Sequence, residues 1–92
     1  NSHVQVAIDS ILFIEASGNY TKVITTDGII SIREKISDTI QLLPDNDFLQ
    51  VHKSFAIAKK HIRSVEGNRI YIRDHIVPIG KLYKTNIIQL LK

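Results

Sequence analysis

Residues 20–33 read YTKVITTDGIISIR, a stretch with the pattern of two strands joined by a tight turn. Polar and apolar residues alternate through Tyr20–Thr26, and a β-branched run, IISIR, follows Asp27 and Gly28. Because Asp-Gly between two such runs is a strong hairpin signal, we predict a β-hairpin here. The stretch therefore indicates an antiparallel, β-rich fold.

Strand signals extend over most of the 92 residues. Seventeen residues are isoleucine, whose β-branched side chain fits a pleated sheet better than a helix. Ile11–Glu15 (ILFIE) has the pattern of a buried strand, and HIRSVE and RIYIR flank the turn pair Gly67-Asn68 as a second hairpin. In RIYIR, Ile70 and Ile72 alternate with polar or charged neighbours, which predicts one buried and one solvated face. A last short strand is expected at IVPI.

Two segments follow the period of a helix instead. Ile36, Ile40 and Leu43 fall on one face of a short central helix that Pro44 ends. A C-terminal helix is predicted to begin just after Gly80, and its apolar positions are Leu82, Ile87, Ile88 and Leu91. Because several strands separate the two helices, a helix-turn-helix is not supported. The pattern predicts a mainly β domain with one central and one C-terminal helix.

The composition is that of one ordinary globular domain, which we assign to residues 1–92. Apolar residues make up 43% and charged residues 23%, and no apolar stretch approaches the ~20 residues of a membrane span. Membrane insertion is therefore not expected. The absence of Cys excludes disulfides and thiolate metal sites, and it favours a reducing, cytoplasmic location. Residues 1–3 are interpreted as a cloning remnant.

The net charge of +3 and the pI near 9.3 suit an anionic partner without requiring one. Basic residues concentrate where predicted strands end or the last helix begins, at Lys22, Lys53, Lys59, Lys60, Lys81 and Lys84. If these loops gather on one side, they form a basic rim with Asn19, Thr21 and Ser54 as hydrogen-bonding neighbours. A merely solvated lysine surface is an equally open alternative.

A catalytic or metal site has little support in the sequence. His52 and Ser54 would share a face of an extended chain, but there is no nucleophile elbow or Gly-rich oxyanion loop. The protein is therefore not expected to be an enzyme. The four histidines show no paired ligand spacing, so neither a metal nor a cofactor is predicted. For His52 a hydrogen bond that fixes the shape of its loop is favoured over direct contact with a base.

Three segments in order resemble one family. DSILFIEASGNYTKVITTDG, then LLPDNDFLQVHKSF, then VPIGKLYK after a hairpin are similar to the LytTR DNA-binding domain, the output module of many bacterial response regulators. The resemblance runs from about Asp9 to Leu91. It implies a stack of small antiparallel sheets, and it implies that loops and strand ends, rather than a recognition helix, enter the major grooves of DNA.

Carried over position by position, the resemblance assigns base contacts to three residues in three separate loops. These are Thr21 after the NY motif, Lys53 after the histidine, and Lys81 in the late segment. The contacts that it assigns to the DNA backbone fall on Asn19, Tyr20, Lys22, Arg33, Ser54 and Lys84.

The sequence departs from the family pattern at four positions. Gln50 stands where many members have Arg, and Ala58 stands where an Asn is common, which bears on local geometry rather than on the binding mode. Lys53 and Lys81 stand where Arg is frequent. Because an ammonium group is a point donor without a planar fork, we expect a softer preference for guanine.

The favoured interpretation is sequence-specific binding of double-stranded DNA by the output domain of a bacterial two-component response regulator. The resemblance implies an N-terminal receiver domain in the full-length protein and paired copies on promoter direct repeats. The alternative is a β-rich module that uses the same basic loops to bind a protein or acidic peptide, with strand addition at an open sheet edge as its mode.

Overall fold

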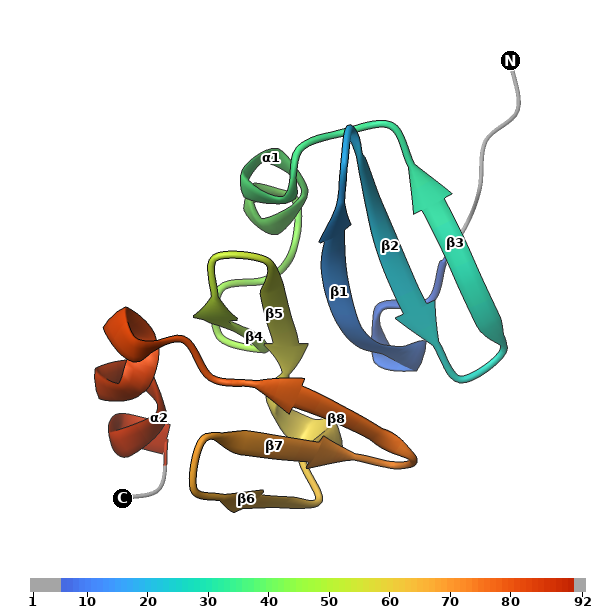
Figure 1. Cartoon of the computed structure of the whole chain (residues 1–92). Coiled ribbons are helices and arrows are strands. Elements are labelled where there is room, and N and C mark those ends of the chain that lie inside the picture. Colours follow the sequence, from blue (N-terminus) through green and yellow to red (C-terminus); the bar gives the residue numbers. More distant parts are fainter. Residues whose placement is uncertain (1–5, 91–92) are drawn as a thin grey trace.

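The computed structural model describes residues 6–90, so the interpretation of residues 1–3 as a remnant falls outside the described part. The described chain forms two antiparallel sheets and two short α-helices (Figure 1). The larger sheet has the strand order β3-β2-β1-β5-β4, and the smaller has the order β6-β7-β8. This architecture confirms the mainly β fold class predicted from the sequence.

The larger sheet contains β1 (Ile11–Ser17), β2 (Tyr20–Thr25), β3 (Gly28–Ile32), β4 (Phe48–His52) and β5 (Phe55–Ala58). The smaller sheet contains β6 (Ser64–Glu66), β7 (Arg69–Ile72) and β8 (His75–Pro78). The helices are α1 (Ile36–Gln41) and α2 (Lys84–Leu90), and the short 3-10 segments are η1 (Ile8–Ser10), η2 (Lys59–His61) and η3 (Lys81–Tyr83).

Both predicted hairpins are confirmed, with one difference in detail. Thr25 pairs with Gly28 across β2 and β3, so Gly28 opens β3 instead of lying inside the turn. The Thr25 hydroxyl donates to the Gly28 carbonyl oxygen at 2.8 Å and accepts from the backbone N–H of Asp27 at 3.1 Å, which holds this turn. In the second hairpin Gly67 has φ +61°, the left-handed conformation that a two-residue turn requires.

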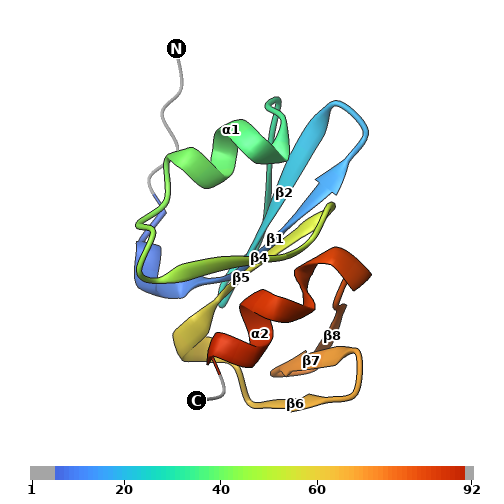
Figure 2. The ribbon, with the colours of Figure 1, turned by 90° about the vertical axis from the view of Figure 1, so that its left-hand side faces the viewer.

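The larger sheet is covered on both faces, as Figure 2 shows. On one face α1 packs against a cluster that we call the helix-side cluster: Ile11, Ile14, Val23, Phe48, Ala56 and Ala58. On the other face, the smaller sheet and α2 enclose the inter-sheet cluster: Leu12, Phe13, Ile24, Val51, Ile57, Ile70, Ile72, Val77, Ile79 and Ile87. Cover on both faces explains why β1 begins with four consecutive buried residues.

The apolar positions that predicted the two helices are partly buried in the first helix but mostly exposed in the second. Ile36, Ile40 and Leu43 pack together against the helix-side cluster, as expected from their spacing. In the C-terminal segment only Ile87 of the described residues follows the prediction, because Ile88 is 57% exposed and Leu82 is 91% exposed. Leu82 lies in the 3-10 turn η3 that precedes α2, and it stands five residues before Ile87, a spacing that does not share one α-helical face. Leu91 lies outside the described residues.

Candidate nucleic-acid interface

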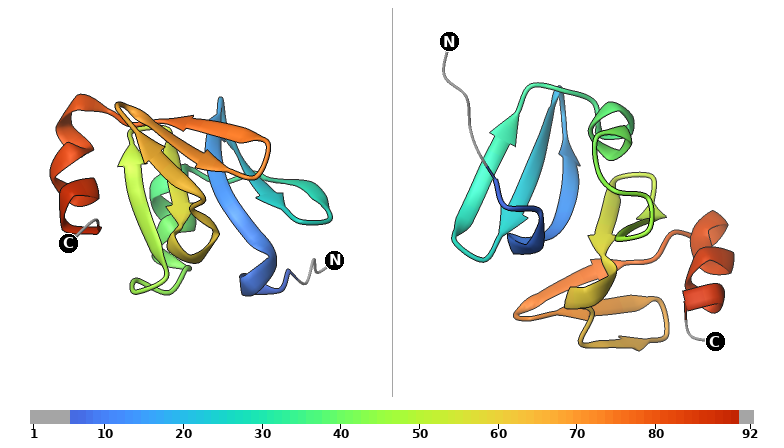
Figure 3. Two further views of the ribbon diagram at one scale, coloured as in Figure 1. Left: turned by 90° about the horizontal axis from the view of Figure 1, so that it is seen from below. Right: turned by 180° about the vertical axis from the view of Figure 1, so that it is seen from behind.

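Three connections that are distant in sequence lie along one edge of the molecule, which we call the loop edge. They are the β1–β2 turn at residues 18–19, the β4–β5 turn at residues 53–54, and the segment at residues 80–84. Figure 2 shows all three on the same side, and the view from below in Figure 3 agrees. The loop edge therefore brings together the regions that carry most of the predicted contact residues.

The β1–β2 turn is joined to the β4–β5 turn through the backbone. Ser17 pairs with Tyr20 across a two-residue turn, in which Gly18 has φ +62°. Just before that turn, the N–H of Ala16 donates a 2.8 Å hydrogen bond to the carbonyl oxygen of Ser54. Asn19, at the tip, is exposed, and Tyr20 is 45% exposed. The tip of this hairpin is thus fixed beside Ser54 while its polar side chains face solvent.

His52 fixes the shape of the β4–β5 turn. Its Nδ1 accepts a hydrogen bond from the backbone N–H of Ser54 at 3.0 Å, and its ring lies edge-on to Phe55 with centroids 5.5 Å apart. Gln50 adds a second support, because its Nε2 donates to the His52 carbonyl oxygen at 3.2 Å. The loop-fixing hydrogen bond expected for His52 is therefore present. Lys53, between these fixed residues, is exposed.

Gly80 brings the segment of Lys81 against the same turn. Its N–H donates to the Val51 carbonyl oxygen at 2.7 Å, and a Cβ at Gly80 would lie 3.3 Å from the Cα of His52. Because a side chain would crowd this approach, glycine permits the close contact between the two segments. The two segments consequently line one open depression, which is formed by His52, Lys53 and residues 80–83. The structure places Lys53 and Lys81 together on the loop edge.

The other predicted contact residues differ in exposure, and Arg33 follows β3, at the other end of the larger sheet from the β4–β5 turn. Lys84 is exposed at the start of α2, and Arg33 is exposed just after β3. Lys22 is half-buried within β2, paired between Glu15 and Ser31 of the neighbouring strands. Ser54 is half-buried.

Thr21 does not lie on the exposed surface, and the expectation that it contacts a base does not fit its position. Its side chain is completely buried, and its hydroxyl donates a 2.8 Å hydrogen bond to the carbonyl oxygen of Glu34. This bond ties β2 to the chain that leaves β3. The sequence contained a signal for this burial, since Thr21 stands two residues before Val23 and therefore shares its buried face. The Thr21 hydroxyl is therefore committed to the backbone of this connection.

Sequence reasoning missed one contact between α2 and β4, and it did not anticipate the exposure of one residue at the loop edge. Asn86 donates through Nδ2 to the Gln50 carbonyl oxygen at 3.1 Å, which fastens α2 to β4. Leu82 was counted among the apolar positions of the C-terminal helix, but it is an exposed member of the loop edge. No pattern in the sequence marks the first contact, because its partners are 36 residues apart.

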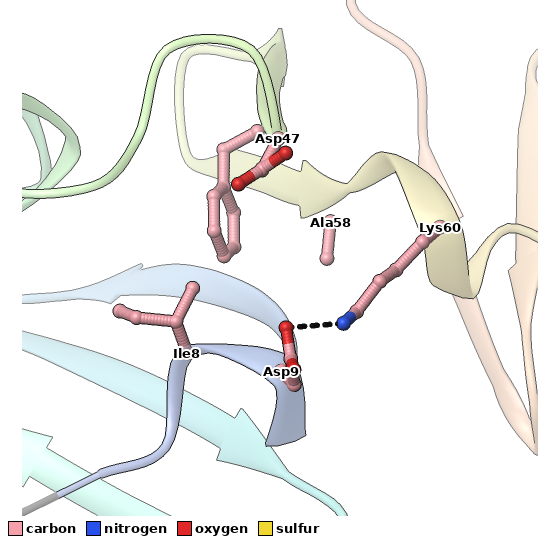
Figure 4. Close-up of a pocket in the computed structure, with 6 residues that line it drawn as sticks. Ile8, Asp9, Asp47, Ala58 and Lys60 are labelled. Carbon is pink, nitrogen blue, oxygen red and sulfur yellow. Dashed lines mark hydrogen bonds and ion pairs between the residues drawn. The ribbon is translucent and has the colours of Figure 1, made fainter.

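The opposite side of the molecule carries an ion pair. Lys60 of η2 reaches Asp9 of η1, beside a small pocket that Ile8, Asp47 and Ala58 also line (Figure 4). The hydrogen bond and positive charge of Lys60 lower the pKa of Asp9 from its usual value of 3.8. Within residues 6–90, neither Lys53 nor Lys81 has such a carboxylate partner. The positive charges of the loop edge are therefore less compensated than that of Lys60.

Two further features, a metal site and a membrane-spanning helix, are absent from the part of the chain that the structure describes. Residues 6–90 contain no group of three or more histidine or acidic side chains arranged to hold a metal ion. None of the helices there is long and apolar enough to cross a membrane.

A mainly β domain whose polar loops converge at one edge is a scaffold for recognition by loops. The family model of the LytTr DNA-binding domain matches residues 1–92, and the chain belongs to this family. The resemblance seen in the sequence is thereby confirmed. The family is one of DNA-binding domains, which agrees with the basic loop edge.

A regulator and a solved structure are similar to this chain. The CO-responsive transcriptional regulator RcoM of Rhodospirillum rubrum is 28% identical over 88 residues, which cover 88% of this chain and 37% of that protein. The chain thus spans well under half of the regulator's length. The LytTr DNA-binding domain of a protein described as a methyl-accepting/DNA response regulator from Bacillus cereus superposes with a TM-score of 0.87. It is 20% identical, and the match covers 96% of this chain and 86% of that domain, which shows the shared fold.

Proposed function

We propose that this domain reads a specific DNA sequence in the major groove through the loop edge, with Lys53 and Lys81 contacting bases. The contacts proposed for the DNA backbone are those of Asn19, Tyr20, Lys22, Arg33, Ser54 and Lys84. Thr21, which the family resemblance assigned to a base, positions its hairpin in this proposal. Its buried hydroxyl is committed to Glu34.

The observation that carries the proposal is the fixed proximity of the turns that hold Lys53 and Lys81. Their backbones are tied by the hydrogen bond from Gly80 to Val51 and by the packing of Gly80 against His52. Two ammonium groups on a rigid edge suit the acceptor atoms that guanine presents in the major groove. Because each ammonium group is a point donor, we expect a weaker guanine preference than paired guanidinium groups would give.

We also propose the regulatory setting that the family membership favours. The domain is the output module of a cytoplasmic bacterial response regulator, joined to an N-terminal receiver domain in the full-length protein. Two copies bind neighbouring direct repeats in a promoter, since one domain of this size makes too few contacts for high affinity. In this proposal the domain binds DNA and catalyses no reaction.

The test is selection of bound duplexes from a randomised DNA pool, followed by titration of the recovered duplex at increasing salt concentration. Sequence-specific binding yields a motif and a linear fall of log affinity with log salt. A slope that corresponds to roughly 3 to 6 neutralised phosphates fits the proposed backbone contacts. A pool that yields no motif, with binding that disappears near physiological salt, would show that the loop edge is only a charged surface.

A second function is favoured by the edge of β3, which pairs with no further strand among residues 6–90. This strand is one of the two outer members of the larger sheet, and its Ile29 is 63% exposed. An extended peptide could add to that edge through backbone hydrogen bonds. Such binding predicts that alanine at Lys53 and Lys81 leaves affinity for the partner unchanged, which separates it from DNA reading.

A further inference from the structure

Leu82 has an unusual position for a large apolar side chain. It is 91% exposed, the largest exposed fraction among the large apolar residues described. Single exposed leucines are common and by themselves indicate nothing. Leu82, however, directly follows Lys81 and lines the same depression as Lys53. The loop edge therefore contains an apolar group beside its two proposed base-contacting amines.

The backbone around Leu82 is held in place. Gly80, two residues before Leu82, donates a backbone hydrogen bond to Val51. The N–H of Tyr83 in turn donates to the Gly80 carbonyl oxygen at 2.9 Å. A Cβ on Gly80 would lie only 3.0 Å from the Tyr83 ring, so this ring closes over the glycine. Leu82 is thus directed outward by a tight turn with fixed ends. A fixed apolar group can select a partner more sharply than a mobile one.

The chemistry of the major groove supplies one apolar feature that matches such a group. Each base edge presents hydrogen-bonding atoms, and thymine alone among the four bases adds a C5-methyl group. An ammonium group can donate to O6 or N7 of guanine but also to O4 of thymine, so lysine alone discriminates poorly. An apolar contact beside the lysines would supply the missing discrimination.

We propose that Leu82 is a specificity-determining residue that packs against the C5-methyl group of a thymine next to the base reached by Lys81. This inference rests on the proposed DNA binding of the loop edge. Burial of one methyl group corresponds to about a fourfold change in affinity, from ~0.8 kcal/mol. Leu82 then adds a thymine to the recognised motif.

The test replaces each thymine of the selected duplex, one at a time, by deoxyuridine. This exchange removes the methyl group and leaves the hydrogen-bonding atoms unchanged. Dissociation constants are measured by fluorescence anisotropy for the parent domain and for Leu82→Ala. We expect one thymine at which deoxyuridine weakens binding of the parent by about fourfold. At that position Leu82→Ala is indifferent to the exchange, and it binds the thymine duplex at least as weakly as the parent binds the deoxyuridine duplex.

Leu42→Ala is the matched control. Leu42 is 74% exposed and follows α1, whose C-terminal end lies on the side of the molecule away from the loop edge (Figure 2). This variant keeps the sensitivity of the parent to deoxyuridine. The inference is overturned if the parent tolerates every exchange, if Leu82→Ala remains as sensitive as the parent, or if the motif contains no thymine. Failure of the proposed DNA reading differs, because no motif is then recovered at all.

Discussion

The backbone N–H of Gly80 lies 2.7 Å from the carbonyl oxygen of Val51 and donates a hydrogen bond to it. Val51 precedes His52 and Lys53, and Gly80 precedes Lys81. This bond therefore sets the distance between the backbones that carry the two lysines, although the lysines are 28 positions apart in the sequence. The long lysine side chains are flexible, but the points from which they extend are fixed.

Gly80→Ala should weaken both the fold and the binding of DNA. The added Cβ would lie 3.3 Å from the Cα of His52, where backbone must move, so we expect the unfolding free energy to fall by about 1 to 3 kcal/mol. Urea denaturation measures this loss, and anisotropy with the selected duplex measures affinity. Thr85→Ala, at an exposed position of α2, serves as a control that changes neither. Unchanged stability and affinity in Gly80→Ala would show that the close approach is unimportant.

Lys53→Ala and Lys81→Ala should each weaken binding of the selected duplex by about 1 to 3 kcal/mol and relax the preference at one base position. Arginine at the same positions should sharpen a preference for guanine, because its planar fork donates to O6 and N7 together. Repeating the selection with each variant measures both effects.

Arg63→Ala is the control for the lysine variants, since it removes one positive charge between η2 and β6, on the side away from the loop edge (Figure 2). It should bind nearly as the parent does. Lysine variants that recover the parental motif with parental affinity would exclude Lys53 and Lys81 as base contacts.

Thr21→Val tests whether Thr21 positions the hairpin or contacts a base. Valine has a similar shape but lacks the hydroxyl, which leaves the Glu34 carbonyl oxygen without this donor. We expect a loss of about 1 to 3 kcal/mol in unfolding free energy, while Thr21→Ser retains much of the stability. The base preference of the folded Thr21→Val domain should stay that of the parent. A changed preference without a loss of stability would return Thr21 to the role that the sequence suggested.

Features that depend on neighbouring residues could be predicted from the sequence. The hairpin at Gly67-Asn68 requires only a turn pair that accepts positive φ between two alternating strands. Burial at Ile70 and Ile72 follows from the same alternation. The family resemblance then named the loops, because its motifs lie in order along the chain.

Features that depend on distant contacts could not be predicted. The bond between Gly80 and Val51 brings two loops together without any local pattern that indicates it. Leu82 was counted among the apolar positions of the C-terminal helix, but it lies in the 3-10 turn that precedes α2 and is 91% exposed.

His52→Ala should reduce DNA affinity through Lys53 rather than by loss of a DNA contact. The substitution removes the acceptor for the Ser54 N–H, a hydrogen bond worth about 0.5 to 1.5 kcal/mol, and lets the turn vary in shape. A double-mutant cycle with Lys53→Ala measures the coupling. We expect His52→Ala to have little further effect on affinity once Lys53 is absent. Losses that simply add would mean that His52 acts on DNA independently of Lys53.

Asp9→Asn should lower stability at neutral pH and lose this effect in acid. Lys60 lowers the pKa of Asp9 below 3.8 in the folded state, so the ion pair stabilises the fold above the unfolded-state pKa. That contribution declines as the pH falls below 3.8 and through the folded-state pKa, where both states bind the proton. Because the pair is exposed, its effect is small and is screened by salt. Thermal midpoints of the parent and Asp9→Asn, measured from pH 7 downward, should therefore converge in acid, with unchanged DNA affinity at neutral pH. A difference that persists below the folded-state pKa of Asp9 would show that Asp9 stabilises the fold by some means other than its charge.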